Sequence, residues 1–489
     1  MLSKAHGRSG KAGILLLVLF VVFVAVCAAV SAFAQGKAES KNMELVGYND
    51  LQGRSAYQPT IHKQGNRWIA YIGHHAGATM NSLTGQMEDN GTSIVDVTDP
   101  KNPKYIAHIP GDPRGAPMPG MGETGGAQMT RVCDGSALPR ADKSKVYLLR
   151  TRGTTAHEVW DVTDPAKPSR VTVVVSGLRD THKSFWECDT GMAFLVSGAP
   201  GWRAMRMGQV YDLSDPAEPQ FIRNYGLPGQ EPGSTGPTPA DMHGVISTGP
   251  SGNRIYAGYG TTRSGIIEIL DRDKLIHGPK DPTVANLESP MISRFDLPPD
   301  VGAHTTFPLI GVDVPEFAKF GPAISKRNFL VVVGETTDNE CKEPQQMMHI
   351  FDITTETKFY GVSTYYVPEP SGNFCSRGGR FGMHSTNENM TPVFYNRIVF
   401  VATFNAGVRA IDVRDPYSPR EIGYYIPAIT DKTDKRCVGT GDAQKCKIAI
   451  QTNNVEVDGR GYIYIVDRAN TGLHILQLSG DARKIENLP

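Results

Sequence analysis

Short runs in which apolar and polar residues alternate recur along most of the chain, and each run ends at a turn. The clearest run, residues 91–97 (GTSIVDV), continues into Thr-Asp-Pro and then into a second extended run at residues 104–107. Alternation with a period of two predicts β-strands, and Asp-Pro predicts a tight turn. The chain is therefore built from a repeat of strand, turn and strand. Close or weaker copies of the repeat stand at residues 158–165, 209–216, 266–271, 349–353, 408–416 and 473–478.

A further β-rich run precedes each copy. Examples are residues 68–72, before the copy at 91–97, and residues 397–401, before the copy at 408–416. A shorter run stands before each of these and would be the innermost strand. Four strands in each of seven units predict a seven-bladed β-propeller, because one four-stranded sheet cannot bury both of its faces alone. We expect one all-β domain over residues 35–489.

The two ends of the chain predict how the ring closes. Little sequence after residues 473–478 could form an outer strand, whereas residues 43–48 (MELVGY) resemble the outer runs at 220–225 and 420–424. We expect the segment 43–48 to complete the last blade, which would remove an open sheet edge. The alternative is that residues near 484–485 form this strand and that residues 43–48 form a tail.

The repeat resembles that of the LVIVD-repeat family of exported β-propellers. The resemblance rests on runs such as residues 93–100 (SIVDVTDP) and 158–165 (EVWDVTDP), and it covers nearly the whole chain after residue 34. It implies the propeller architecture and export. It implies little about activity, because one fold hosts many functions.

The first 34 residues predict export. Lys4, Arg8 and Lys11 precede an almost wholly apolar stretch, residues 13–34, which ends in Ala-Phe-Ala. This is the pattern of a secretory signal peptide with cleavage after Ala34. The alternative is an uncleaved anchor, because the stretch is long enough to span a bilayer. We expect a secreted or periplasmic protein that is not inserted in a membrane once the signal is removed.

The composition of the chain indicates which classes of partner are unfavoured and which redox environment the protein meets. Lys plus Arg and Asp plus Glu both number 50, so nothing favours nucleic acid or an anionic membrane as a partner. Cys27 lies in the predicted signal, and the other cysteines are even in number, which in an exported chain predicts disulfides. Sequence alone leaves the pairing open. Nearness in sequence and in the repeat favours Cys133–Cys188, Cys341–Cys375 and Cys437–Cys446.

Histidines recur at one position of the repeat, the start of the innermost strand. They are His62, His182, His243, His304 and His384. The innermost strands of a propeller surround its axis, so equivalent residues would form a ring at one end of the central channel. Several imidazoles that converge on an axis suit a transition-metal ion such as copper, iron or zinc. We expect the four histidines from successive blades, His182 to His384, to be the ligands, and His62, His74 and His75 to extend the site.

Other candidate residues are expected at the same mouth of the channel. The turn after the second strand carries the His74-His75 pair and Glu335. Glu335 and Glu123 are candidate catalytic acid/base or outer-shell carboxylates, and Arg380 could hold an anion. Long loops rich in glycine and proline enter the innermost strands and suggest a lid over a pocket. These loops are residues 111–126, 226–240, 368–380 and 428–447.

The recurring histidines also have a structural interpretation. In WD-type propellers a histidine near the innermost strand joins a hydrogen-bond network inside its own blade, with Ser or Thr and Asp, and binds nothing. The spacing from His182 to Asp212 and from His384 to Asp412 is compatible with such a network. Against it, these histidines begin the inner strand, and two blades have none there.

Two functions follow from these alternatives. The first is a metal-dependent enzyme, an oxidoreductase or lyase, that acts on a small-molecule substrate in the channel mouth. Its plan is similar to that of the carotenoid-cleavage oxygenases, with four histidines on iron(II), and of the selenium-binding/methanethiol-oxidase family, with histidines on copper. The chain has no specific motif of either family. The second function is a non-enzymatic propeller that displays its loops to a protein or cell-surface partner.

Overall fold

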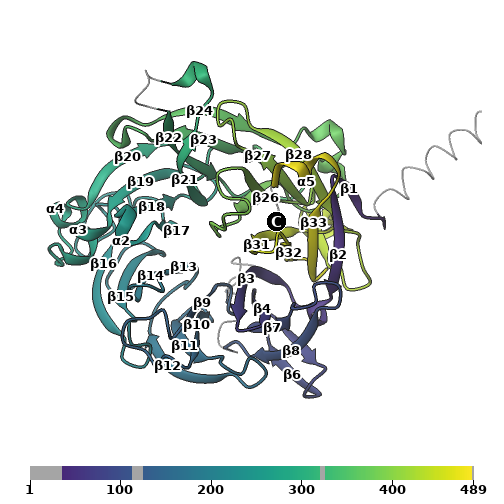
Figure 1. Ribbon diagram of the computed structural model, residues 1–489, viewed down its shortest axis with the longest axis horizontal. Coiled ribbons are helices and arrows are strands. Elements are labelled where there is room, and N and C mark those ends of the chain that lie inside the picture. The colour runs from purple at the N-terminus through teal and green to yellow at the C-terminus, as the bar shows by residue number, and fades with distance from the viewer. Residues whose placement is uncertain (1–35, 113–124, 320–324, 487–489) are drawn as a thin grey trace, which may run out of the picture.

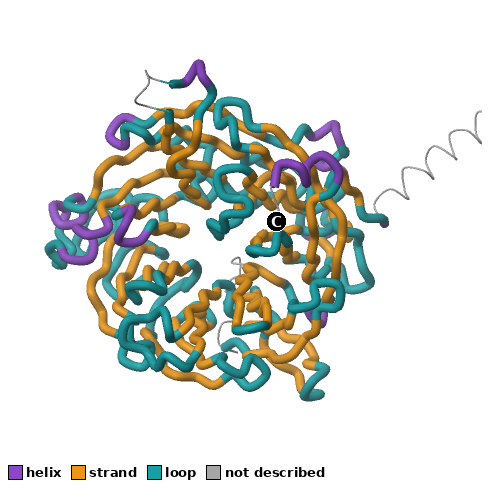
Figure 2. Tube along the Cα trace, viewed as in Figure 1, coloured by secondary structure: helices purple, strands orange, loops and turns teal. Residues whose placement is uncertain are grey.

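The computed structural model describes residues 36–112, 125–319 and 325–486 (Figure 1). Strands make up most of its regular structure, and the helices are few and short (Figure 2). The predicted all-β class is therefore confirmed. The predicted signal peptide, residues 1–34, lies outside the described residues.

Five antiparallel sheets contain four strands each, in chain order from one edge of the sheet to the other. Each sheet thus has the composition of one predicted repeat unit. The five sheets are β3 (Ala56–Gln64), β4 (Arg67–His74), β7 (Thr92–Asp96) and β8 (Lys104–Ile109); β9 (Thr130–Asp134), β10 (Val146–Arg152), β11 (Ala156–Asp161) and β12 (Ser169–Val175); β13 (Ser184–Trp186), β14 (Met192–Ser197), β15 (Met207–Asp212) and β16 (Gln220–Tyr225); β17 (Met242–Ser247), β18 (Arg254–Tyr259), β19 (Ile266–Asp271) and β20 (Met291–Asp296); and β21 (Thr305–Asp313), β22 (Lys326–Val333), β23 (Met348–Asp352) and β24 (Tyr360–Tyr365).

A larger sheet of nine strands contains two further units of the same kind. A pairing of Phe404 with Thr452 joins these two units, and one additional strand pairs with the outer edge of the first. The first unit consists of β25 (Phe381–Thr386), β26 (Ile398–Phe404), β27 (Val408–Asp412) and β28 (Arg420–Ile426), with β1 (Glu39–Lys41) outside β28. The second unit consists of β31 (Thr452–Val457), β32 (Ile463–Asp467), β33 (Leu473–Leu478) and β2 (Met43–Asn49).

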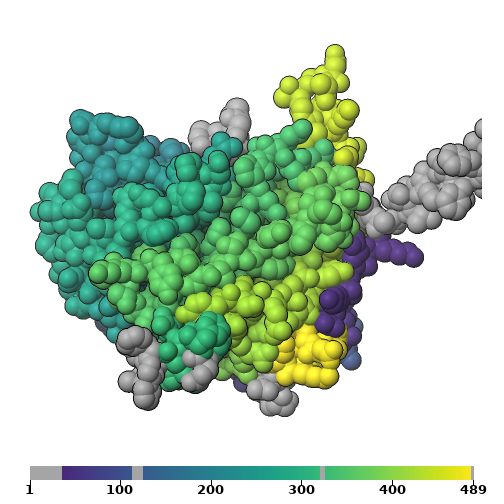
Figure 3. All heavy atoms as spheres, turned by 90° about the horizontal axis from the view of Figure 1, so that it is seen from above, coloured from purple at the N-terminus to yellow at the C-terminus, as the bar shows by residue number. Residues whose placement is uncertain are grey.

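Short elements decorate this framework. Two hairpins, β5 (Ala78–Asn81) with β6 (Gln86–Asp89) and β29 (Lys435–Val438) with β30 (Lys445–Ile448), form sheets of their own. The hairpin β29–β30 projects from the body in the space-filling view as a yellow-green protrusion (Figure 3). The helices are α2 (Gly249–Gly252), α3 (Arg272–His277), α4 (Val284–Glu288) and α5 (Gly480–Glu486).

The aspartates of the repeat form the turns between strands. The Oδ1 atoms of Asp96, Asp161 and Asp212 each accept a hydrogen bond from the backbone N–H two residues later, at 2.8 to 3.0 Å. The second aspartate of the repeat does the same, as Asp99 shows. Such side-chain turns compete well with strand geometry, and the following proline stops the strand. The repeated Asp-Pro pattern therefore marks where β7, β11, β15 and β27 end.

The units are arranged around a common centre (Figure 1), each with its first strand innermost. Each innermost strand contacts the next in the order β3, β9, β13, β17, β21, β25, β31 and back to β3. Neighbouring sheets pack their faces together, because successive side chains of a strand point to opposite faces. Ile72 packs in one cluster with Val466, and the preceding Tyr71 packs in another with Leu148. Each sheet is thereby buried on both faces by its neighbours.

The N-terminal strand β2 completes the sheet of the C-terminal strands. It pairs antiparallel with β33, from Met43 opposite Leu478 to Asn49 opposite Leu473. The predicted pairing of residues 43–48 with the last strand of the chain is confirmed. The alternative is wrong, because residues 484–485 lie in the helix α5.

Three disulfides join the cysteines as predicted: Cys133–Cys188, Cys341–Cys375 and Cys437–Cys446. Disulfides of this number are consistent with an extracellular or periplasmic protein. Among the described residues, no helix combines the length and the hydropathy that a membrane span requires.

Candidate metal centre

Four histidines from successive units lie against one another at the centre. His243 and His384 lie in β17 and β25, and His182 and His304 stand just before β13 and β21. All four residues are at most 5% exposed. The ring centroids are 4.6 Å apart for His182 and His243, 3.5 Å for His243 and His304, and 4.3 Å for His304 and His384. The structure therefore brings the expected quartet together.

Irregular pairing at the start of the inner strands aims these side chains at the centre. The register of β17 with β18 shifts between Met242 and Gly244, so His243 is left out of the ladder. The register of β25 with β26 shifts between Phe381 and Ser385, around His384. A bulge frees one residue from the regular alternation and redirects its side chain.

Backbone carbonyls fix the tautomer of two of the histidines. Nδ1 of His243 donates to the carbonyl oxygen of His304 at 2.8 Å, and Nδ1 of His384 donates to the carbonyl oxygen of Asn453 at 2.6 Å. A carbonyl oxygen only accepts, so each neutral ring carries its proton on Nδ1. The Nε2 atoms of His243 and His384 are then unprotonated and able to bind a metal.

The other two histidines are held in the same way. Nδ1 of His182 lies 2.6 Å from Oε1 of Gln128, and Nδ1 of His304 lies 2.8 Å from Oγ1 of Thr305. Such partners on the second ring nitrogen are typical of metal-binding histidines, because they orient the ring. Among the described residues, Nε2 of His304 and Nε2 of His384 are buried without a hydrogen-bond partner.

Burial keeps the four imidazoles neutral. It lowers the pKa of His182, His243 and His304 well below the usual 6.5, and nearby positive groups such as Lys183 lower it further. Burial also lowers the pKa of His384 to about 3. At neutral pH all four rings therefore offer lone pairs, which is the form that ligates metals.

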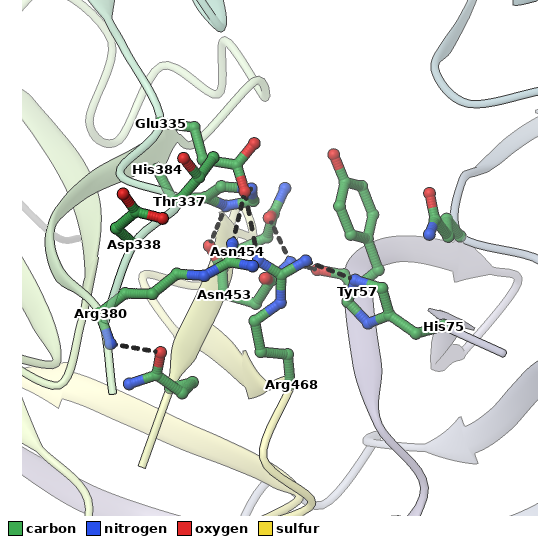
Figure 4. A network of polar contacts seen from close by, with 12 residues as sticks. Tyr57, His75, Glu335, Thr337, Asp338, Arg380, His384, Asn453, Asn454 and Arg468 are labelled. Atoms are coloured by element: carbon green, nitrogen blue, oxygen red, sulfur yellow. Dashed lines mark hydrogen bonds and ion pairs between the residues drawn. The ribbon is translucent and has the colours of Figure 1, made fainter. Parts of the chain in front are cut away.

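Glu335 lies at the edge of the cluster. Its carboxylate, with His243 and His304, presents three ligand atoms that lie within 4.8 Å of one another, and its Oε1 is 3.6 Å from Nε2 of His384. Arg380 and Arg468 donate hydrogen bonds to Oε1, at 2.9 and 3.2 Å (Figure 4). Burial on its own raises the pKa of Glu335, but the positive charges of Arg380 and Arg468 outweigh this effect and hold the pKa below its usual value. Glu335 is therefore a carboxylate at neutral pH.

Tyr57 is a residue of the site that the histidine pattern did not predict. It lies at the start of β3, where the pairing with β4 shifts between Ala56 and Pro59. It is 1% exposed, and its Oη lies 3.1 Å from Nε2 of His182. The signal in the sequence is positional: Tyr57 stands at the start of an innermost strand, as the histidines do.

His62, expected at that position, does not join the cluster. The strand β3 already begins at Ala56, so His62 lies near its far end, and the expectation that it starts the strand is wrong. Its Nε2 contacts Oδ1 of Asp134 at 3.0 Å. In β3, the position near the start of the strand that corresponds to the other histidines is therefore not occupied by a histidine.

His74 and His75 lie in two different environments. His74 is hydrogen-bonded through Nε2 to Oγ of Ser93 and through Nδ1 to the carbonyl oxygen of Ser55, at 2.7 and 3.1 Å, so both of its nitrogens are engaged in the fold. Nε2 of His75 lies 2.8 Å from Arg468. His75 and Arg468 line a pocket of about 340 Å³ together with Ser55 and Arg436. Glu123 lies outside the described residues.

Comparison with known proteins adds no name to this site. The chain matches no protein-family model and no curated protein.

Proposed function

We propose that the protein is an exported seven-bladed β-propeller of the LVIVD-repeat family that holds a transition-metal ion at one mouth of its central channel. The propeller is supported by the four-stranded units and by the closed sequence of contacts between innermost strands. Family membership is supported by the repeat itself, from residues 91–100 onward, and by the turns that its aspartates form.

The observation that carries the metal centre is the mutual contact of four neutral imidazoles, two of which, His243 and His304, present ligand atoms within 4.8 Å of each other and of Glu335. Each Nδ1 has a partner, and the Nε2 atoms of His182 and His243 lie only 2.8 Å apart. Two nitrogens that both present lone pairs repel each other at this distance unless a cation or a proton lies between them. Imidazole nitrogens favour copper, iron, zinc or nickel over magnesium or calcium, and we propose copper, iron or zinc.

The contacts also argue against the blade-internal hydrogen-bond network. Such a network would tie each histidine to Ser or Thr and Asp of its own unit. Instead, His182 contacts His243 of the next unit, and His243 donates to the backbone of His304 in the unit after that. The Oδ1 of Asp212 meanwhile accepts from the backbone of its own turn. Apart from His304, whose Nδ1 contacts the adjacent Thr305, the histidines are thus bonded to other units rather than to their own sheets.

For the reaction, we propose an oxidation–reduction or lyase step on a small molecule bound to this ion. Glu335 fits the role of a further ligand or of a base, because its lowered pKa keeps it ionised. Arg380 and Arg468 hold that carboxylate in place. The pocket lined by His75 and Arg468, which contact Tyr57 and Glu335 respectively, offers space for a small molecule. A propeller without metal would instead favour the role of a binding platform for a protein partner.

The experiment is a metal analysis of the full chain, purified from its export compartment without a histidine tag. We expect a stoichiometric transition metal, either as purified or after chelator treatment and reloading with copper, iron or zinc. The double variant His243→Ala/His304→Ala should lose the metal. The control His62→Ala should keep it, because His62 lies outside the cluster. A wild-type protein that takes up none of the three metals would refute the proposal, and so would unchanged metal content in the double variant.

A further inference from the structure

We infer that Tyr57 is a further ligand of this centre and binds the ion through its phenolate oxygen. The inference rests on the proposed metal centre and concerns which oxygen completes it. The starting observation is that Oη of Tyr57 lies 3.1 Å from Nε2 of His182, a nitrogen already assigned to the ion.

The distances fit neighbouring ligands of one ion. Two atoms bound at about 2.1 Å lie about 3.0 Å apart when they subtend a right angle at the metal, and about 3.4 Å apart in a tetrahedron. Nε2 of His182 lies 2.8 Å from Nε2 of His243 and 3.1 Å from Oη of Tyr57. Both separations are those of adjacent positions at about a right angle around a single ion, as in square-planar, square-pyramidal or octahedral coordination.

The tyrosine is held where it is by the cluster itself. Its ring makes edge contacts with His75, His182 and His384, at centroid distances of 5.2, 5.2 and 5.8 Å. The ammonium group of Lys183 lies 5.8 Å from the ring centroid. Figure 4 shows the Tyr57 ring beside His75 and across from Glu335 and His384. A ligand that is already positioned loses little entropy on binding.

The hydrogen bond of the phenol leads to the same conclusion. Among the described residues, its partner is Nε2 of His182. Once that lone pair is given to an ion, the O–H group loses its acceptor, and a buried hydroxyl without a partner is costly. Coordination resolves this: the Oη–H bond breaks, an Oη–metal bond forms, and the proton leaves to the buffer. The oxidation state of the ion does not change.

Burial raises the pKa of Tyr57, so its phenolate would be stabilised here only by a bound cation. The four histidines contribute no charge, and the charged groups whose fields reach them include Lys183, Arg206 and Arg468. Glu388 pairs with Lys183 and Asp180 with Arg206, at 2.7 Å in each case, whereas Glu335 is shared between two guanidinium groups. A cation added to neutral imidazoles here gains from a negatively charged ligand of its own. The phenolate of Tyr57 supplies one.

Copper(II) is the probe for this ligand, because a copper(II)–phenolate bond gives a visible charge-transfer band. The chelator-treated full chain is titrated with copper(II), and absorption and resonance Raman spectra are recorded. We expect the band, with tyrosinate ring vibrations, in the wild type. Tyr57→Phe should bind copper and lose the band. Tyr259→Phe is the control, since Tyr259 is equally buried and donates to Glu268, away from the cluster; it should keep the band.

The outcomes separate this inference from the proposed function. Copper-loaded wild type without tyrosinate vibrations, or a band unchanged in Tyr57→Phe, would overturn the phenolate ligand while leaving the metal centre standing. A wild type that binds no copper, iron or zinc would overturn both. If Tyr57→Phe does not fold, the Raman spectrum of the wild type decides, because incorporation of ring-deuterated tyrosine must shift the vibrations if they come from a tyrosinate.

Discussion

At the scale of single residues, the neutral histidines couple the stability of the fold to pH. Burial lowers the pKa of His384 to about 3, against 6.5 for the free side chain, and that of His182, His243 and His304 falls well below 6.5. Below pH 6.5 the unfolded chain therefore binds more protons than the folded one. The stability that the neutral histidines contribute is fully present above pH 6.5 and is lost as the pH falls from there towards 3.

We predict that the free energy of unfolding of the metal-free protein falls between pH 6.5 and 5 by up to about 1.4 kcal/mol per pH unit for each such histidine. Urea unfolding at several pH values measures this slope. His384→Asn should reduce the slope. His474→Asn should reduce it too, because burial lowers the pKa of His474 to about 4, but should leave metal binding unchanged. A flat profile over this range would contradict the assignment of neutral imidazoles.

The sequence predicted part of this site at residue level. His182, His243, His304 and His384 were found because histidine itself recurs at one repeat position. Tyr57 was missed because its position is visible only once the bulge between Ala56 and Pro59 is known, and a one-residue irregularity changes which side chain faces the centre. Arg468 likewise reaches Glu335 across the ring, from a turn 133 residues away in sequence.

At the scale of elements, the closing strand β2 depends on a close approach at Gly47. A Cβ atom built there would lie 1.9 Å from the carbonyl oxygen of Pro100, in the turn of the neighbouring unit. We predict that Gly47→Ala shifts the urea midpoint to lower concentration, by an amount equivalent to about 1–3 kcal/mol, because a backbone atom cannot move aside cheaply.

Gly361 offers the matched control, since it also lies in an outer strand, β24. A Cβ atom there would meet only Phe351, at 3.8 Å, which is ordinary van der Waals contact. Gly361→Ala should leave the midpoint nearly unchanged. Equal midpoints for the two variants would show that β2 does not pack as described.

The repeat made the four-stranded units and the closing strand predictable, because alternation, Asp-Pro turns and outer-strand similarity are all local in sequence. Other elements lacked such a signal. The strand β1 pairs with β28 through only Glu39, Ser40 and Lys41, a polar segment with no apolar alternation. The hairpin of β5 and β6 is likewise an insertion outside the repeat.

At the scale of the whole molecule, the disulfides differ in what they restrain. Cys133–Cys188 joins β9 to the adjacent unit across 55 residues of sequence, whereas Cys437–Cys446 closes a hairpin with a separation of 9. Loop-closure entropy predicts that the longer loop stabilises by about 1.5 kcal/mol more. Double Ser variants of each pair, compared by urea unfolding, test this. A larger loss from the hairpin pair would contradict the entropic account.

The assembly of the site is a property of the complete ring. Residues from opposite ends of the sequence meet there. For example, Oγ of Ser55 donates a hydrogen bond to the backbone carbonyl oxygen of Arg468, which lies 413 residues later in the chain. Periodicity predicts that units form a ring, but not which atoms meet at its centre. Those distances depend on packing between all units at once.

The most direct test of the central claim is anomalous diffraction from crystals of the metal-loaded protein, with data collected on both sides of the absorption edge of the metal. The account predicts one anomalous peak within bonding distance of Nε2 of His182, His243, His304 and His384. Loaded crystals with no peak among these four nitrogens, or with their only peak elsewhere on the chain, would contradict it.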